Sequence, residues 1–247
     1  MRIALVSDTH ANLEAVSACL EHARGNDAGQ LVFLGDLVGY GADPGPVVDI
    51  VMGAVARGGV AVLGNHDLGV AREPGGAMHP DARRAIAWTR GQLSATQLRF
   101  LDRLPLTAEQ DGRLYVHANA WAPAGWEYVM GVFDAGRSMR ATPCRLTFCG
   151  HTHEPALYHM TGDGQVSGFT PVPGAGIPLG RLRRWLAIPG SAGQPRDGNP
   201  AACYALFDDA TGVMTWFRVA YDFVTAARKI REAGLPDSFA ARLEAGY

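Results

Sequence analysis

The chain has 247 residues, of which 47% are apolar and 19% charged, and its formal net charge is −2. This length and apolar content are enough to bury a full core, and the even composition predicts a single domain over residues 1–247. No Lys-rich or Arg-rich tract is present, so a general basic surface for long nucleic acid is not expected.

Cysteine usage and the N-terminal residues indicate the compartment. The four cysteines show no CxxC spacing, and Cys149 lies inside an apolar run, which is typical of a reduced protein with buried thiols. The chain enters a strand pattern directly, without a basic and apolar leader. No apolar stretch approaches the roughly 18–20 residues needed to cross a bilayer. We therefore expect a cytoplasmic protein that does not contact a membrane.

The first third of the chain alternates strand and helix patterns. Apolar runs predict three buried strands, over Arg2–Ser7, Leu31–Leu34 and Val60–Leu63. A helix over 12–24 with Asn12 as its N-cap follows the first strand, and a helix over 44–56 opened by Pro44 follows the second. This βαβαβ order predicts a parallel sheet with right-handed crossovers.

The rest of the chain begins with helices and becomes rich in strands. Helices are predicted over 80–92 and 94–103, the second with Ser94 as N-cap and Gln97 as its capping-box partner. Strands are predicted over Leu114–His117, Leu146–Cys149, Pro155–Met160, Leu182–Ile188, Ala202–Phe207 and Val213–Arg218. Asp222 begins a helix to about 233, and a short helix ends the chain. We expect a second sheet that is more antiparallel than the first, and a Gly/Pro-rich loop over Phe169–Gly180.

Side chains that can bind metal follow the apolar runs in a fixed order. The motifs are Asp8-Thr9-His10, Gly35-Asp36, Gly64-Asn65-His66-Asp67, a lone His117, and Gly150-His151-Thr152-His153. Strand ends are where an open α/β sheet collects its functional groups. Two divalent ions about 3.5–4 Å apart need a bridging anionic oxygen and neutral ligands on each side. Carboxylate, imidazole and amide donors in this order therefore indicate a two-metal hydrolase.

Each motif by itself has a structural explanation. Asp36 could cap the next helix, Gly64–Asp67 could be a turn, and His117 could be a hydrogen-bonded buried histidine. The pair His151 and His153 is harder to explain in this way, because alternating side chains at a strand end point to one side and imidazoles are costly to bury without partners. The joint pattern favours the metal site.

The five motifs together resemble the calcineurin-like metallophosphoesterase superfamily, whose pattern is D-x-H, G-D, G-N-H-[DE], H and G-H-x-H. The match runs from Asp8 to His153 in the correct order. Residues 38–44, 189–197 and the strand that follows resemble the small bacterial and archaeal members. The resemblance implies an α/β (α+β) fold: a four-layer αββα sandwich of two facing mixed β-sheets flanked by helices.

The resemblance also implies a role for each motif residue. Asp8, His10 and His153 would hold one metal ion, and Asn65, His117 and His151 the other, with Asp36 bridging both. A water between the ions would be the nucleophile. His66 would contact a phosphate oxygen and stabilise or protonate the leaving group, beside Asn65. The implied catalytic residues are thus His66 and Asp36.

Two positions depart from relatives of this superfamily. The protein-phosphatase branch carries an Asp three residues after its bridging Asp, where this chain has Gly39, so a protein phosphatase is disfavoured. Ala11 stands where many relatives have glycine, and we attach no functional meaning to it. Arg196 is a further candidate substrate-binding residue, because its planar fork suits phosphate, although a salt bridge within a turn explains it equally well.

The leading hypothesis is a dinuclear-metal phosphoesterase that acts on a phosphodiester or a small nucleotide-type substrate. The mixed ligand set admits Mn, Fe, Ni, Co or Zn, with Mn favoured. The alternatives are a non-catalytic protein-binding scaffold on the same fold and a hydrolase of non-phosphate esters. Retention of all seven ligands and of His66 weighs against the scaffold. The oligomeric state stays open.

Overall fold

The three N-terminal strands form the parallel part of the first sheet, as predicted. The structure, a computed structural model, describes residues 1–72 and 80–247. β1 (Arg2–Val6) pairs in parallel with β2 (Ala28–Phe33), and β2 with β3 (Val60–Ala61). α1 (Leu13–Gly25) and α2 (Pro44–Ala56) connect them. The side chain of Asn12 accepts a hydrogen bond from the Ala15 N–H at 3.1 Å, which confirms the predicted N-cap.

Strands from the C-terminal half complete this first sheet. β11 (Ala202–Asp208) pairs antiparallel with β1, and β12 (Val213–Val219) pairs with β11. β9 (Gly176–Pro178) adds the edge strand, so part of the predicted loop over 169–180 is a strand. The sheet order is β3-β2-β1-β11-β12-β9. The late strands therefore do not form a sheet of their own.

The second sheet is as mixed as the first. Its strands are β4 (Thr107–Gln110), β5 (Arg113–Val116), β6 (Leu146–Phe148), β10 (Arg184–Ile188), β7 (Ala156–Met160) and β8 (Val166–Phe169), in that spatial order. β5 and β10 both pair in parallel with β6, and the remaining pairs are antiparallel. The expectation of a more antiparallel second sheet is wrong, because strands distant in sequence provide the antiparallel neighbours of β1.

The helices include two that the sequence did not predict. These are α3 (Asn65–Ala71), which begins inside the motif interpreted as a turn, and α6 (Val132–Arg140). The others are α4 (Pro80–Gln92), α5 (Ala95–Asp102), the 3-10 turn η1 (Pro123–Gly125), α7 (Phe223–Glu232) and α8 (Asp237–Ala245). The capping box of Ser94 and Gln97 and the Asp222 cap are confirmed. Within the described parts of the chain, no helix is both long and apolar enough to span a bilayer.

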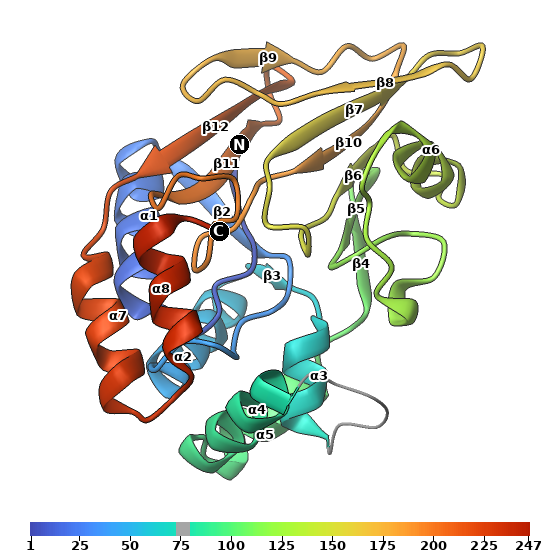
Figure 1. Cartoon of the computed structure of the whole chain (residues 1–247). Coiled ribbons are helices and arrows are strands. Elements are labelled where there is room, and N and C mark those ends of the chain that lie inside the picture. The colour runs from blue at the N-terminus through green and yellow to red at the C-terminus, as the bar shows by residue number, and fades with distance from the viewer. Residues whose placement is uncertain (73–79) are drawn as a thin grey trace.

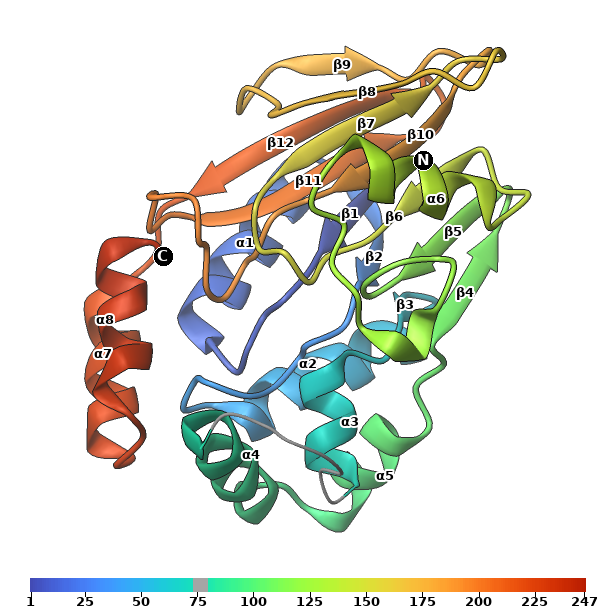
Figure 2. The same ribbon diagram turned by 45° about the vertical axis from the view of Figure 1, so that its right-hand side comes forward.

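The two sheets face each other and are covered by helices on their outer sides (Figure 1). α1 and α2 pack on the first sheet, and α6 packs on the second. Side chains alternate along β1 accordingly: Ile3 and Leu5 enter the core between the sheets, whereas Ala4 and Val6 join the core under the helices. The predicted αββα sandwich is confirmed. Figure 2 shows the α3–α5 group below the sheets and the α7–α8 hairpin at one side.

The core between the sheets provides a test of this packing. Phe148 is 1% exposed, and its ring lies 5.7 Å from that of Phe207 on the opposite sheet. Replacing Phe148 with Ala should lower the free energy of unfolding by about 3–5 kcal/mol, since it removes a buried ring and leaves a cavity. Phe133→Ala on α6, where the side chain is 79% exposed, is the control and should change it by less than about 0.5 kcal/mol. Urea denaturation measures both, and equal effects would contradict this account.

Candidate metal centre

The seven predicted ligands lie where strands of both sheets end. In chain order they are Asp8 and His10 after β1, Asp36 after β2, Asn65 after β3, His117 after β5, and His151 and His153 after β6. All but Asn65 are buried. The structure therefore brings together, at the carboxyl ends of the parallel strands, residues that are up to 145 positions apart from Asp8 to His153.

The backbone at these positions is strained. Five of the residues have positive φ angles: Asp8 (51°), His10 (44°), Asp36 (50°), His151 (71°) and His153 (66°). The left-handed region costs a non-glycine residue of order 1–3 kcal/mol, and such strain concentrates at functional sites. Its repetition around one cluster indicates that the fold holds these side chains for a function other than stability.

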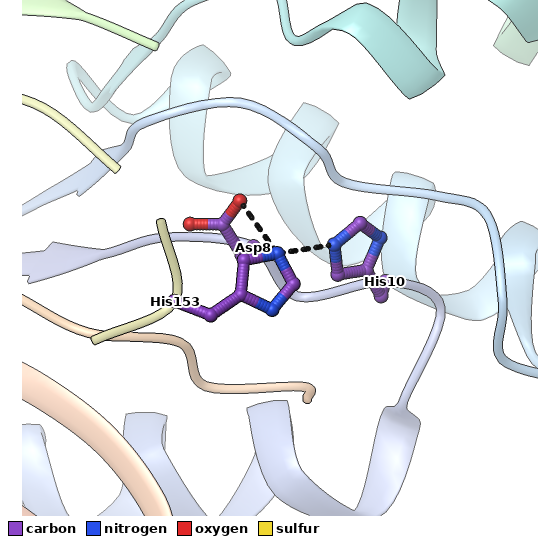
Figure 3. A group of neighbouring side chains, drawn as sticks. All are labelled: Asp8, His10 and His153. Atoms are coloured by element: carbon purple, nitrogen blue, oxygen red, sulfur yellow. Dashed lines mark hydrogen bonds and ion pairs between the residues drawn. The ribbon is translucent and has the colours of Figure 1, made fainter. Parts of the chain in front are cut away.

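The first group consists of Asp8, His10 and His153 (Figure 3). The Nε2 atoms of His10 and His153 are 3.1 Å apart, and Asp8 Oδ1 is 3.4 Å from His153 Nε2. His10 Nδ1 lies 3.2 Å from the Val38 carbonyl oxygen, and His153 Nδ1 lies 2.6 Å from that of Gln194. A carbonyl only accepts, so each Nδ1 carries a proton and, in the neutral ring, each Nε2 presents a lone pair.

The second group repeats this arrangement. His117 Nδ1 donates to the Leu34 carbonyl at 2.8 Å, and His151 Nε2 donates to the Trp126 carbonyl at 2.9 Å. The remaining nitrogens, His117 Nε2 and His151 Nδ1, face each other at 3.0 Å. Hydrogen bonds from the outer nitrogen of a histidine to a backbone carbonyl fix the tautomer and orient metal-binding imidazoles.

Asp36 lies between the two groups. Its Oδ2 is 3.8 Å from His10 Nε2 and 3.5 Å from His117 Nε2, and its Oδ1 accepts the His66 backbone N–H at 2.9 Å. Asn65 Oδ1 is 3.1 Å from His117 Nε2 and so belongs to the second group. The carboxylate can therefore share charge with both groups, which is the position required of a bridging ligand.

Both groups require positive charge at their centres. Lone pairs of buried nitrogens and carboxylate oxygens repel each other unless a proton or metal ion lies among them. Burial opposes charge on His117, yet Asp36 raises the pKa of His117 to about 9. Burial likewise opposes charge on Asp36, but His117 and His66 hold the pKa of that carboxyl well below its usual range. The imidazole, carboxylate and amide donors fit two divalent metal ions.

Asp67 fixes the position of the loop that carries Asp36. Its Oδ1 accepts the backbone N–H groups of Leu37 and Val38 at 2.8 and 3.2 Å, and its Oδ2 accepts that of Gly64 at 3.0 Å. Burial and nearby Asp36 raise the pKa of Asp67 to about 7. The sequence placed Asp67 in a motif but gave it no role. The structure shows that it joins the start of α3 to the end of β2.

His66 is the second residue of α3, after Asn65, and is 6% exposed. Its Nδ1 is buried and has no hydrogen-bond partner in the described residues. Gly39 lies against this atom, since a Cβ built on Gly39 would be 2.6 Å from His66 Nδ1. The space that a carboxylate would need is thus closed, in agreement with the predicted absence of an Asp–His pair. Tyr40 covers the ring, with the two ring centres 4.5 Å apart.

Arg196 follows the loop that supports the first group. The Ser191 hydroxyl donates to the Asp8 carbonyl at 2.8 Å, and the Gln194 carbonyl accepts from His153. Arg196 itself donates to the Gln194 side chain at 3.3 Å and takes part in no ion pair recorded for the described chain. Among the described residues Arg196 forms no turn salt bridge, and the neighbouring Asp197 pairs with Arg218.

Other groups at the site could not be identified from the sequence. The carbonyls of Leu34, Val38, Trp126 and Gln194 orient the histidines, and a backbone carbonyl carries no residue signal. The Tyr128 ring stacks on His151 with centres 4.0 Å apart at 8°. Trp126 has a φ of 56°; its carbonyl accepts from His151, and its ring lies edge-on to His117 with centres 5.8 Å apart. Only tertiary structure reveals these contacts.

Comparisons with known proteins agree with this geometry. A sequence model of the calcineurin-like phosphoesterase superfamily domain matches residues 1–212. The uncharacterized protein MJ0912 of Methanocaldococcus jannaschii is 34% identical over 254 aligned residues, which cover 99% of this chain and 98% of that protein.

Solved structures share the whole fold. A metallophosphoesterase from Sphaerobacter thermophilus is 36% identical with a TM-score of 0.89, and the match covers 100% of this chain and 99% of that one. A hypothetical protein of Pyrococcus horikoshii, PH1004, is 19% identical with a TM-score of 0.81, covering 100% and 98% of the two chains. The second likeness concerns the fold alone.

The two groups should lose metal separately. We expect the protein to bind two divalent ions per chain, and His153→Ala and His151→Ala each to weaken one of them, because each removes a ligand of one group. Loss of a ligand should reduce affinity at that position at least about 10- to 100-fold. Equilibrium dialysis against manganese with elemental analysis gives the stoichiometry. His159→Ala, a histidine of β7 outside both groups, is the control, and two tightly held ions in His153→Ala would contradict the assignment.

Gly39 should resist substitution for two separable reasons. Gly39 and Gly58 have nearly the same backbone angle, with φ of +92° and +90°, but only Gly39 has a neighbour within 4 Å of an added Cβ. Gly58→Ala should therefore cost about 1–2 kcal/mol from backbone strain alone. Gly39→Ala should cost measurably more, since it also displaces His66. Urea denaturation of the two variants provides the comparison, and equal losses would rule out the steric contact.

Proposed function

Since the chain belongs to the calcineurin-like phosphoesterase superfamily, we propose that it hydrolyses phosphate esters of small molecules with two bound divalent metal ions. The strongest support is the geometry around Asp36: two buried clusters of histidine nitrogens and carboxylate oxygens lie on either side of this residue. A structural role does not explain two sets of imidazole lone pairs facing each other. Two cations that share a carboxylate do.

Each ligand has a place in this proposal. Asp8, His10 and His153 would hold one ion, and Asn65, His117 and His151 would hold the other, with Asp36 between the two groups. When bound, the two ions supply a water of lowered pKa and neutralise charge on the phosphoryl oxygens. The hydrogen bonds from the outer histidine nitrogens to backbone carbonyls keep the ligands fixed, so no side chain has to reorganise as charge develops.

His66 and Asn65 act on the substrate side of the centre. The first turn of α3 holds His66 beside Asp36, which accepts its backbone N–H. Burial chiefly lowers the pKa of His66, so the ring is neutral and has one N–H to donate. We assign that N–H to a phosphoryl or leaving-group oxygen. Arg196, close enough for its charge to lower the pKa of His66 further, binds the substrate from the neighbouring loop.

Composition and ligand chemistry support a particular substrate type, metal and compartment. A phosphodiester or nucleotide-type substrate fits the net charge of −2 and the absence of an extended basic tract. Manganese suits a set that mixes imidazole nitrogen with carboxylate and amide oxygen. Four buried free cysteines fit the reducing cytoplasm.

Hydrolysis of bis-p-nitrophenyl phosphate and p-nitrophenyl phosphate tests the function. Metal-stripped protein should be inactive and should regain turnover with manganese, nickel or zinc. His66→Ala should lower kcat by about 100- to 1,000-fold while both ions still bind, because it removes one donor to the developing charge. Asp36→Ala should abolish turnover together with metal binding. The ratio of diester to monoester turnover indicates the preferred ester.

The control for these variants is again His159→Ala, which should keep full turnover. Turnover that persists unchanged in His66→Ala would contradict its role. Metal-loaded protein that hydrolyses neither ester would favour the non-catalytic scaffold. Hydrolysis of carboxylic esters alone would favour a hydrolase of non-phosphate esters.

A further inference from the structure

Tyr40 forms the wall of the metal centre next to His66. Its ring centre lies 4.5 Å from that of His66 and 4.6 Å from that of His10. The residue has a φ of 64°, and Gly41 beside it packs so closely that an added Cβ would be 2.2 Å from the His10 carbonyl oxygen. The loop therefore holds Tyr40 in one position, with its ring against the two histidines.

The C-terminal hairpin packs on the other side of this wall. α7 and α8 follow residue 212, where the match to the superfamily ends. The ring of Phe239 lies 4.8 Å from that of Tyr40, and the Arg242 guanidinium lies 6.0 Å above the Phe239 ring. Lys229 fixes α7 to the body of the protein through ion pairs with Glu14 and Asp43. This fastening holds a cation, Arg242, over the Phe239 ring that packs against Tyr40.

A second cation reaches Tyr40 from the loop after β10. Arg196 hydrogen-bonds to the Gln194 side chain, but its Nε is buried and has no partner in the described residues. The end of the hairpin secures this loop, since the Gly198 N–H donates to the Gly246 carbonyl at 2.8 Å. Burial and the charge of Asp36 raise the pKa of Tyr40, whereas the charges of Arg196 and Arg242 lower it.

Within residues 1–72 and 80–247, no carboxylate forms an ion pair with either guanidinium. Of the ion pairs recorded for the described residues, none includes Arg196 or Arg242, and the neighbouring acids Asp197 and Glu244 pair with Arg218 and Arg231. Two unpaired cations beside a phenol hydroxyl and an unused buried N–H provide donors that match the oxygens of a phosphate. A purely structural set of arginines would instead be expected to use the acids that lie next to them.

We propose that Arg196, Arg242 and the Tyr40 hydroxyl form a subsite for a second phosphoryl group of the substrate, adjacent to the metal centre. This inference rests on the proposed phosphoesterase function and narrows its substrate class. The phosphoryl group to be cleaved occupies the metal centre and contacts His66, and a second phosphoryl group of the same molecule lies beside it, at the Tyr40 hydroxyl. Substrates with two linked phosphoryl groups, such as nucleoside diphosphates, are favoured over those with one.

Kinetics with matched nucleotides test the subsite. AMP has one phosphoryl group and ADP has two, and hydrolysis of both is followed by phosphate release with the manganese-loaded protein. Arg196→Gln, Arg242→Gln and Tyr40→Phe should each raise KM for ADP by about 10-fold or more, as expected when one charge-assisted hydrogen bond is lost. KM for AMP should change by less than about 3-fold in Arg242→Gln and Tyr40→Phe, as a rough limit for a group that does not contact it. Arg196→Gln, which also removes a charge near His66, should raise KM for ADP more than it raises KM for AMP. Arg228→Gln, which removes an exposed arginine of the same hairpin, should change neither.

A binding measurement separates this inference from the function itself. Calorimetry compares methylenediphosphonate with methylphosphonate, which are not hydrolysed, at equal free manganese. The parent protein should prefer the diphosphonate, and the three variants should lose that preference. If this pattern holds but no ester is cleaved, the proposed function fails and the subsite stands. If ADP and AMP are cleaved but the variants affect them equally, or if the parent shows no preference, the subsite is wrong. Thermal unfolding confirms that each variant is folded.

Discussion

The arrangement of buried acceptors at the strand ends is the constraint on which the rest of this structure depends. Two pairs of imidazole nitrogens face each other at 3.1 and 3.0 Å, with Asp36 between them. Such a set is stable in a folded protein only if cations compensate it. Four backbone carbonyls orient the histidines of this set. Five of the ligands have strained backbone angles, and this strain lowers the stability of the fold around the centre.

The two facing sheets make this arrangement possible. One sheet provides Asp8, His10, Asp36 and Asn65, and the other provides the three later histidines. Their relative position is fixed by the aromatic core between the sheets, where Phe148 and Phe207 meet. Since interiors are close-packed, a shift of one sheet against the other would separate the two halves of each ligand group. Packing far from the centre therefore determines its geometry.

The C-terminal hairpin adds features that the metal-binding motifs do not contain. It fastens to the body through Lys229 and reaches the centre through Phe239 and Arg242. Gly39 has a complementary role, because it leaves His66 without an acidic partner and lets the Tyr40 ring lie against it. The candidate metal ligands thus lie at the strand ends, whereas the C-terminal hairpin contributes the positively charged Arg242 nearby.

The sequence by itself determined the N-terminal strand and helix alternation, the caps at Asn12, Ser94 and Asp222, and the order of the motif residues, because periodicity and capping are local signals. Tertiary structure alone decided that β11 and β12 join β1, that α3 begins at Asn65, and that Gly176–Pro178 is an edge strand. Strand pairing depends on partners distant in the chain. The same reason hid the carbonyls that orient the histidines and the packing of Phe239 against Tyr40: these contacts arise from proximity in space, which no local pattern records.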